Sequence, residues 1–425
     1  MYNYLYYGTI FLPRNDKLLY NIASSKSDFQ HIYPEYIRLL KQPILSNEII
    51  DLGVKCLTKA FEESLESKGL KNGKHIIPLS GGLDSRSILG FLLNNFETKE
   101  IITFTYGYKG TLDYEIGRMI ANKVDVKNIS IDTSSFEWKT QKMVDACKVT
   151  GWDCFSNVAY AHSILKYGPE NVYWSGFMGG TRRRGLPKSP SKNWEDAVNL
   201  FIEKNKLKPV TLIPQYACNY LPGKYLPKQP LVNDILVPYD EQLNIIIYQA
   251  IEIWRGMFLD GYDWRAPYIN PNWTGLAFNL PEEWHKKQIY YRKVLIRAFP
   301  KLFDNMPSKT YPNISVSSNS LMKKIIAKGN YVIKRKINKH FIHLLPYKPA
   351  ATLNQIDIDW AIRERSDVQL TILENIEDLR ARKIIDWINT KQLWDDHINR
   401  YANNGNLLNT LAMLELRIKA GIITE

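Results

Sequence analysis

Residues 76–93 read IIPLSGGLDSRSILGFLL, and this run combines three local signals. The apolar residues 76–79 predict a buried β-strand, and residues 87–92 predict a helix. Between them, Gly81 and Gly82 allow a sharp turn and a close approach of the backbone to a ligand. A strand, a glycine turn and a helix N-terminus in this order predict a phosphate-binding loop, because free N–H groups at a helix start attract anions.

The polar side chains of this loop suit a nucleotide. Ser80 and Ser85 supply hydroxyl donors, and Asp84 is a carboxylate that can hold Mg²⁺ on the phosphates. The loop lacks the Gly-Lys-Ser/Thr ending of a Walker A loop, which disfavours a kinase or GTPase. It resembles the PP-loop of ATP pyrophosphatases, which cleave ATP between its α and β phosphates. We therefore predict ATP and Mg²⁺ as ligands, with Asp84 on the metal and the nucleotide bound by Leu79, Ser80, Gly81, Gly82, Asp84 and Ser85.

The rest of the chain predicts an α/β fold followed by helices. Ser46 fits the N-cap of a helix that runs to about Ser67. Beyond the loop, a helix is predicted at 114–122, and strands are predicted at 101–106, 128–131 and 172–175. This alternation predicts a doubly wound parallel sheet that binds ligands at the carboxyl ends of its strands. From about Ile235 onward the pattern is mainly helical.

This pattern predicts that the chain has three parts. Residues 1–45 are predicted to form a short β element, with strands at 7–12 and 18–22. Residues 46–312 are predicted to form the PP-loop α/β domain, and residues 313–425 a helical C-terminal extension.

Composition restricts the location and the chemistry of the protein. The chain has 425 residues and a net charge of +13, and its four cysteines form no CxxC pair. Neither a disulfide framework nor a zinc site is indicated. The chain begins without a basic segment, and it holds no apolar stretch of about 18 residues, the length that a membrane span needs. We therefore expect a cytoplasmic protein.

A basic segment accounts for most of the net charge. Residues 305–353 contain nine lysines and arginines and neither aspartate nor glutamate. Within 321–345, apolar residues recur at near-helical spacing, which predicts a basic amphipathic helix in peripheral contact with an anionic membrane. The alternative is a helix that packs its apolar face on the domain and leaves its lysines solvated. Nucleic acid is disfavoured as a partner, because no RNA-binding module is evident.

Together these features resemble the synthetase domain of the asparagine synthetase superfamily, over about residues 46–312. Five stretches carry the resemblance in matching order: the PP-loop, 103–107 followed by Asp113, 175–180, Arg255 with 261–270, and 291–310. The resemblance implies a fold of the adenine nucleotide α hydrolase-like type. It also implies that Tyr106 lies beside the adenine and that Ser175 and Gly176 bind the opposite side of the nucleotide.

The reaction implied by this resemblance forms an amide in two steps. A substrate carboxylate attacks the α-phosphorus of ATP and releases pyrophosphate, and an amine or ammonia then displaces AMP. The first step builds negative charge, which cations placed in advance stabilise in a water-poor site. The resemblance assigns that role to Lys309, with Lys293 as the alternative. It gives Asp263 the position of a catalytic glutamate in the β-lactam-forming members.

Three positions depart from the superfamily pattern. Gly180 replaces an aspartate that shares the Mg²⁺, although one carboxylate and the ATP phosphates can suffice. Phe177 replaces a tyrosine that serves proton removal in the β-lactam-forming members, and Asn270 replaces a further aspartate. A β-lactam-forming role is therefore disfavoured. A nucleotide-binding partner protein that has lost catalysis is one alternative.

The resemblance also leads to expectations about the source of the nitrogen and about the acid substrate. Full asparagine synthetases begin with a glutaminase domain whose nucleophilic cysteine directly follows the initiator methionine, and this chain has Tyr2 there. Residues 1–45 are interpreted as a remnant of that domain. The nitrogen would then come from free ammonia, a separate glutaminase or an amine-bearing substrate. The segment 291–302 resembles members from surface-glycan gene sets, which predicts a sugar-acid substrate; a peptide macrocyclase is the alternative.

Overall fold

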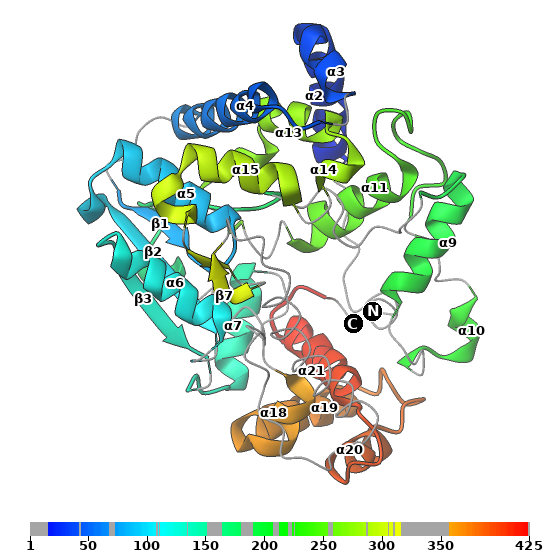
Figure 1. Cartoon of the computed structure of the whole chain (residues 1–425). Coiled ribbons are helices and arrows are strands. Elements are labelled where there is room, and N and C mark those ends of the chain that lie inside the picture. The colour runs from blue at the N-terminus through cyan, green and yellow to red at the C-terminus, as the bar shows by residue number, and fades with distance from the viewer. Residues whose placement is uncertain are drawn as a thin grey trace.

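The computed structural model describes residues 16–41, 44–67, 73–107, 109, 111–133, 135–150, 164–179, 190–206, 212–219, 223–224, 226–253, 258–285, 288–304, 306–308, 311–315 and 357–423. Within these residues, five parallel strands form one sheet in the order β3-β2-β1-β4-β5 (Figure 1). The strands are β1 His75–Pro78, β2 Ile101–Gly107, β3 Lys127–Asp132, β4 Val172–Trp174 and β5 Asp263–Arg265. The order runs outward in both directions from β1, so the predicted doubly wound parallel sheet is confirmed.

Four of the five strands follow from apolar runs, and the fifth does not. The predicted strands at 76–79, 101–106, 128–131 and 172–175 correspond to β1, β2, β3 and β4. The β5 strand lies in a region for which only helices were expected, because its three residues include two charged side chains. It exists through pairing with β4, in which Tyr173 lies opposite Trp264.

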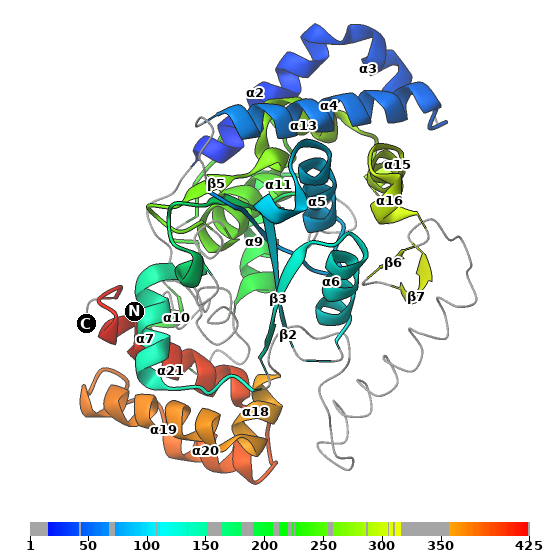
Figure 2. The same ribbon diagram turned by 90° about the vertical axis from the view of Figure 1, so that its left-hand side faces the viewer.

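The two faces of the sheet bury different clusters, as expected when side chains alternate along a strand. Ile77 belongs to a large cluster with α4 Asn47–Glu66, α5 Asp84–Asn95 and α15 Ile289–Ala298. Its neighbour Ile76 belongs to a smaller cluster on the opposite face. Figure 2 shows α5 and α6 Leu112–Lys123 on one side of the sheet.

The helices predicted around the loop are confirmed. The hydroxyl of Ser46 accepts a hydrogen bond from the Ile49 N–H at 3.4 Å and so caps α4, as predicted. Helix α5 begins directly at the loop, and α6 contains the predicted helix at 114–122. The sequence therefore locates both helices that follow β1 and β2.

The N-terminal β element is contradicted where the structure describes it. Residues 18–22, predicted as a strand, lie inside helix α2 Lys17–Ile32, which is followed by α3 Pro34–Leu40. Leu18, Leu19 and Ile22 are buried with Phe29 at helical spacing, and Figure 2 shows α2 beside α13 Pro271–Asn279. Apolar residues three and four positions apart indicate a helix face, which outweighs the short apolar run. The strand predicted at 7–12 lies outside the described residues, and the boundary at 45 stays a prediction.

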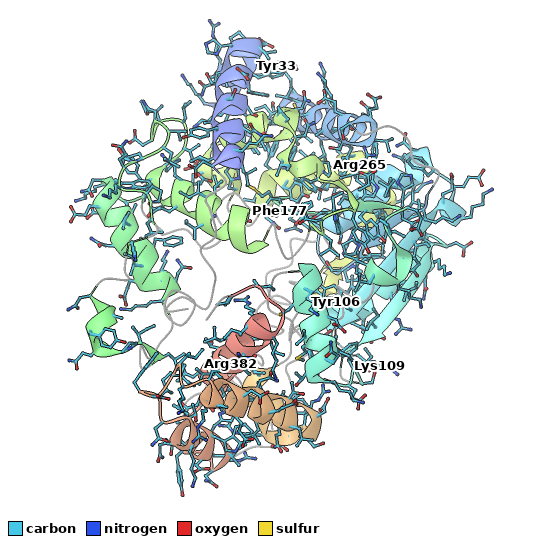
Figure 3. The ribbon with its side chains drawn as sticks, turned by 180° about the vertical axis from the view of Figure 1, so that it is seen from behind. Tyr33, Tyr106, Lys109, Phe177, Arg265 and Arg382 are labelled. Atoms are coloured by element: carbon cyan, nitrogen blue, oxygen red, sulfur yellow. The ribbon has the colours of Figure 1, made fainter. Side chains whose placement is uncertain are left out.

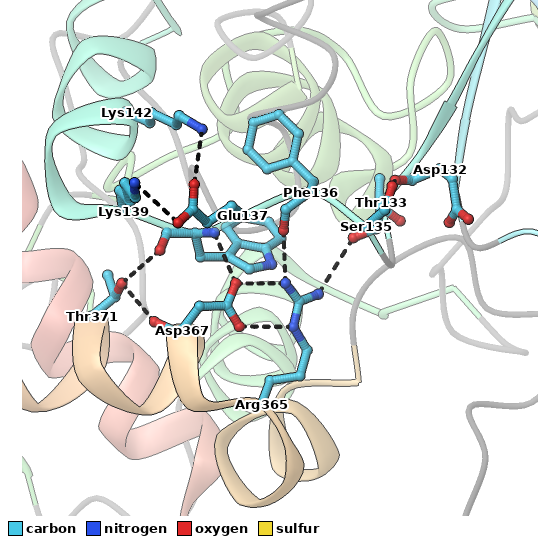
Figure 4. Close-up of polar contacts among 11 residues, drawn as sticks. Asp132, Thr133, Ser135, Phe136, Glu137, Lys139, Lys142, Arg365, Asp367 and Thr371 are labelled. Atoms are coloured by element: carbon cyan, nitrogen blue, oxygen red, sulfur yellow. Dashed lines mark hydrogen bonds and ion pairs between the residues drawn. The ribbon is translucent and has the colours of Figure 1, made fainter.

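Residues 313–315, predicted to begin the helical extension, lie instead in the strand β7 Tyr311–Ser315, because Ser315 pairs with Pro307. The C-terminal part is mainly helical, as predicted, over 357–423. It comprises α18 Ile358–Glu364, α19 Ser366–Ala381, α20 Thr390–Ile398 and α21 Gly405–Lys419, which share a core with α7 Thr140–Thr150. Arg365 joins this unit to the loop after β3 (Figure 4). Its guanidinium donates to Asp367 and to the carbonyl oxygen of Phe136, each at 2.7 Å. Asp367 in turn accepts the Trp138 N–H at 2.9 Å.

The remaining described elements are turns, further helices and a small antiparallel strand pair. They are the 3₁₀ turns η1 Thr98–Glu100 and η4 Pro267–Ile269, the π-helical η3 Asn244–Ile253, helices α9 Trp194–Asn205, α10 Gln215–Cys218, α11 Tyr239–Leu243, α14 Glu282–His285 and α16 Pro300–Phe303, and the antiparallel pair β6 Pro307–Ser308 and β7 Tyr311–Ser315. In the part of the chain that the structure describes, no helix is long and apolar enough to cross a membrane. The basic segment 321–345 lies outside that part.

Candidate functional site

Two glycine loops meet where the strand order reverses. The PP-loop follows β1, a second loop at 175–179 follows β4, and these two strands are neighbours in the sheet. Crevices at this position bind ligands in open α/β sheets. A Cβ atom added at Gly179 would overlap the carboxylate of Asp84, and one at Gly176 would come within 2.8 Å of the Asp84 Cβ. Only glycine at these two positions lets the second loop lie directly on Asp84.

The PP-loop is shaped by its own side chains and by α6. The Ser80 N–H donates to the Ser85 hydroxyl at 3.2 Å, and the Gly82 N–H donates to the Ser80 hydroxyl at 3.1 Å. The Gly81 N–H donates to Asp113 Oδ1 at 3.1 Å. Both serines and Asp113 therefore hold the backbone of the turn, a role that precedes any contact with a nucleotide.

The start of helix α5 suits an anion. Its N-cap residue is Leu83, whose apolar side chain makes no capping hydrogen bond. The first N–H groups of a helix have no partner inside the helix, so an uncapped start next to a glycine turn favours an anionic ligand. The predicted position of the phosphates is thus consistent with the local geometry.

Neutral hydroxyl groups lie on one side of Asp84. The Tyr291 O–H donates to Asp84 Oδ1 at 2.9 Å, and the hydroxyl oxygens of Tyr291 and Tyr268 are 2.6 Å apart. The Ser87 hydroxyl contacts that of Tyr268. Burial, followed by the charge of Asp84, raises the pKa of each tyrosine well above its ordinary value, so both stay protonated. Neither tyrosine was singled out from the sequence, although both lie inside the stretches that carry the resemblance.

The described residues fit a magnesium ion that is shared with phosphates. Asp84 is the carboxylate at the loop, and the described part of the chain contains no group of three or more side chains that could hold a metal by themselves. Mg²⁺ usually binds one or two carboxylates and completes its coordination with phosphate oxygens and water. As far as the described residues go, Asp84 would therefore hold the ion together with a nucleotide.

Arg86 is a buried cation beneath the loop that the sequence reasoning missed. Its guanidinium donates to the carbonyl oxygens of Gly81 at 3.3 Å, Leu302 at 3.3 Å and Pro307 at 2.9 Å. Burial lowers its pKa to about 10, so the group stays charged at neutral pH. Arg86 thus joins the PP-loop to the segment that leads to Lys309, which itself lies outside the described residues. An arginine within an otherwise apolar helix was the available signal.

The other predicted nucleotide contacts lie at the same edge of the sheet (Figure 3). Tyr106 is half-buried near the end of β2, and burial, with a contribution from Asp113, raises its pKa to about 12. Ser175 directly follows β4, and its hydroxyl accepts the Phe177 N–H at 3.2 Å. Phe177 is buried in edge-to-face contact with Phe258, with ring centroids 5.6 Å apart. The position of the superfamily tyrosine is therefore part of an apolar core.

Asp263 lies apart from these residues. It begins β5 level with Val172, the first residue of β4, whereas the PP-loop leaves the opposite end of the sheet. Its carboxylate accepts a 2.9 Å hydrogen bond from Arg265, and the two side chains are 2 % and 1 % exposed. Arg265 also donates to the carbonyl oxygens of Ser64 and Leu65, each at 2.8 Å. The structure brings Asp263 into an ion pair that anchors α4, and its catalytic role stays a prediction.

Two further positions have local roles. Asn270 caps α13 by accepting the Asn272 N–H at 2.9 Å, and its amide donates to Glu63 at 3.0 Å. Lys293, the alternative to Lys309, is exposed on α15. Gly180 and Arg255 lie outside the described residues.

A pocket opens beside Asp84, between the second loop and helices α13, α14 and α15. Its walls are mainly aromatic and aliphatic, and they include Gly179, Tyr268, Trp273, Trp284 and Tyr291. Gly179 and Tyr291 also contact Asp84. The pocket therefore adjoins two residues that contact the carboxylate.

The fold and the loop define a nucleotide-binding α/β domain of the PP-loop type, and comparisons with known proteins agree over one segment. A family model described as queuosine biosynthesis protein QueC, a PP-loop ATP pyrophosphatase family, matches residues 74–150. These residues extend from the start of β1 through the PP-loop to the end of α7. The segment is thus similar to that of ATP-using enzymes.

Curated relatives match over a similarly short stretch. Proteins named 7-cyano-7-deazaguanine synthase are 33% identical over 73 residues in Wolinella succinogenes, 34% over 70 in Staphylococcus saprophyticus and 38% over 65 in Bacillus subtilis. These stretches cover 17%, 16% and 15% of this chain and 31%, 31% and 30% of the relatives. The chain therefore spans about a third of the length of the curated relatives it matches.

Proposed function

We propose that the chain is an ATP-dependent carbon–nitrogen ligase of the asparagine synthetase type, which forms AMP. It would activate a substrate carboxylate as its adenylate, release pyrophosphate and transfer the acyl group to an amine or ammonia. The observation that carries the proposal is the meeting of two glycine loops on Asp84, where the strand order reverses. The QueC match over residues 74–150 supports the use of ATP.

The described side chains have distinct tasks in this proposal. The N–H groups at the start of α5 bind the departing pyrophosphate, and the buried charge of Arg86 favours an anion above it. Asp84 holds the Mg²⁺, which when bound neutralises charge that develops on the phosphates. Lys309, from its place in the resemblance, stabilises the same charge. Tyr106 and the loop after β4 enclose the nucleotide.

The proposal also includes a class of acid substrate and a source of the amine nitrogen. From the resemblance of residues 291–302, we propose a sugar acid of a surface glycan, with ammonia supplied directly or by a separate glutaminase. Aromatic side chains can stack against the apolar faces of sugar rings, and the pocket near Asp84 has aromatic walls. A peptide whose carboxylate is joined to its own amine is the alternative.

The comparisons favour a second candidate, the synthesis of 7-cyano-7-deazaguanine named in the relatives. The matched residues 74–150 hold the PP-loop but neither the second loop nor the aromatic pocket. The similarity therefore bears on the use of ATP more than on the acid. A nucleotide-binding partner protein without catalysis is a third candidate, since Gly180 and Phe177 depart from the superfamily pattern.

A pyrophosphate-release assay separates these candidates. The purified chain is incubated with Mg-ATP, ammonia or an amine, and a panel of sugar acids, peptides and 7-carboxy-7-deazaguanine. We expect pyrophosphate and AMP in equal amounts, dependent on one class of acid. Formation of ADP and phosphate would contradict the proposal, and binding of Mg-ATP without turnover on any acid would favour the partner protein.

A further inference from the structure

Two adjacent tyrosines on α15 have different acceptors. Tyr290 and Tyr291 are both buried, at 1 % and 5 % exposure. The Tyr290 O–H donates to the carbonyl oxygen of Ile49 on α4 at 2.9 Å. The Tyr291 O–H donates to Asp84 Oδ1, also at 2.9 Å. One hydroxyl therefore ties two helices together, whereas the other reaches the carboxylate at the PP-loop.

The bond from Tyr291 is part of a longer chain of hydroxyl contacts. The Tyr291 O–H donates to Asp84 Oδ1, and its oxygen lies 2.6 Å from that of Tyr268. The Tyr268 O–H lies 3.5 Å from the carbonyl oxygen of Asp84. The Ser87 hydroxyl contacts Tyr268 and donates to the same carbonyl oxygen at 2.8 Å. The chain therefore starts at the carboxylate of Asp84 and ends at its backbone carbonyl.

This arrangement restricts the carboxylate without neutralising it. Tyr291 occupies Oδ1, and Gly179 packs against the same carboxylate. The group is therefore held in one orientation before any ligand binds. Because these hydroxyl partners are neutral, the bonds themselves do not cancel the negative charge. A lysine or arginine in the place of Tyr291 would cancel that charge.

We propose that Tyr291, supported by Tyr268 and Ser87, is a positioning residue that holds the Asp84 carboxylate for the cation of Mg-ATP. The inference rests on the proposed use of ATP at this loop. Groups that hydrogen-bond a metal-ligating side chain typically change metal affinity by about 10- to 100-fold when removed. Tyr291 is expected to act in this way through Asp84, with no contact of its own to the nucleotide.

The test measures ATP binding by calorimetry on the purified full chain, once with Mg²⁺ and once with excess EDTA. For Tyr291→Phe we expect ATP affinity in Mg²⁺ to fall about 10-fold or more, while affinity in EDTA stays unchanged. Tyr290→Phe is the matched control, because it removes the same atom from a neighbouring buried ring. It should leave both affinities unchanged, although both variants should lower the melting temperature.

Tyr268→Phe keeps the bond from Tyr291 to Asp84 and removes only its support. It should weaken binding in Mg²⁺ by a smaller factor, and it carries the test if Tyr291→Phe does not fold. Equal Mg²⁺-dependent affinity in Tyr291→Phe and Tyr290→Phe would overturn the proposal. An equal loss with and without Mg²⁺ would also overturn it, because that result indicates packing alone.

Failure of the proposed function gives a different result. If the unmodified chain binds no ATP in Mg²⁺, both proposals are wrong, and this is seen before any variant is made. If it binds Mg-ATP but releases no pyrophosphate with any acid, the ligase proposal fails. The positioning role of Tyr291 would then still stand, because its measurement is of binding.

Discussion

Asp84 and Asp263 are two aspartates in the same α/β domain that accept hydrogen bonds from different kinds of side chain. Asp263 accepts a hydrogen bond from a guanidinium at 2.9 Å, and both side chains of that ion pair are almost fully buried. Asp84 accepts one from the neutral hydroxyl of Tyr291, also at 2.9 Å. The first carboxylate has a permanent cation beside it, and the second has a partner that orients it without cancelling its charge.

This difference separates a structural carboxylate from one that is suited to bind. Placing charge in a protein interior costs free energy that a fixed cation offsets, and the resulting pair has little remaining attraction for other ions. A carboxylate held by hydroxyls keeps its attraction, provided that a cation reaches it from outside. We therefore expect substitutions at the two sites to affect different measurements.

The largest effect is expected for Asp84→Asn. The amide keeps an acceptor for Tyr291 but removes the charge that holds Mg²⁺, so pyrophosphate release should fall by at least about 10³-fold, or about 4 kcal/mol of activation free energy. The melting temperature should change little. Asp263→Asn is the control. It should lower the melting temperature and leave pyrophosphate release nearly unchanged. Loss of turnover without loss of stability in that control would restore the catalytic role predicted for Asp263 from the sequence.

Arg265→Met tests the ion pair from its other side. It leaves the Asp263 carboxylate buried without its guanidinium and removes two hydrogen bonds to α4. Breaking a buried pair in this way costs about 3–5 kcal/mol, which urea unfolding followed by circular dichroism can measure. The double variant with Asp263→Leu should recover part of that loss. A decrease below about 1 kcal/mol would show that the pair contributes little.

The pH dependence of stability should reveal His75, which lies on β1 near the same ion pair. Its Nδ1 accepts a hydrogen bond from the Trp174 indole at 3.0 Å, and burial lowers its pKa from 6.5 to about 4. Because the unfolded chain takes up a proton at higher pH than the folded chain, stability is full above pH 6.5 and decreases as the pH falls toward 4. The loss amounts to about 3 kcal/mol.

Urea unfolding between pH 7 and pH 4.5 can measure this decrease. The variant His75→Gln cannot take up the proton, so its stability should fall less steeply over the same range. Parallel curves for the two proteins would contradict the assignment to His75.

The smallest effect is expected at the contact of the C-terminal helices, where a second ion pair, between Arg365 and Asp367, is partly exposed. Arg365→Ala removes hydrogen bonds to Asp367 and to the Phe136 carbonyl (Figure 4). The free energy of unfolding should decrease by about 2 kcal/mol, since both bonds involve a charged group. Mg-ATP affinity should be unchanged, because the contact lies away from the PP-loop. A fall in that affinity would indicate that the C-terminal unit contributes to the site.

Much of the fold was accessible from local patterns. The apolar run before the PP-loop, the glycine pair and the alternation of strands and helices predicted four of the five described strands of the sheet, together with α4, α5 and α6. These signals depend on near neighbours in the chain, so they can be recognised without knowledge of the fold. The same kind of signal was misjudged at 18–22, where a short apolar run was preferred over the helical spacing that buries Leu19, Ile22 and Phe29.

For the candidate site, too, some features could be predicted from local sequence and others could not. From its own loop, Asp84 could be assigned to a phosphate-binding turn, because glycines and hydroxyls at fixed spacing require no distant partner. Its contact with Tyr291 spans 207 positions, and the bond from Arg86 to Pro307 spans 221. Such partners depend on how helices and strands are placed in space, which no local pattern encodes. Residue type and spacing therefore predicted the nucleotide-binding loop, whereas the packing of α15 against that loop decided that the hydroxyl of Tyr291 reaches Asp84.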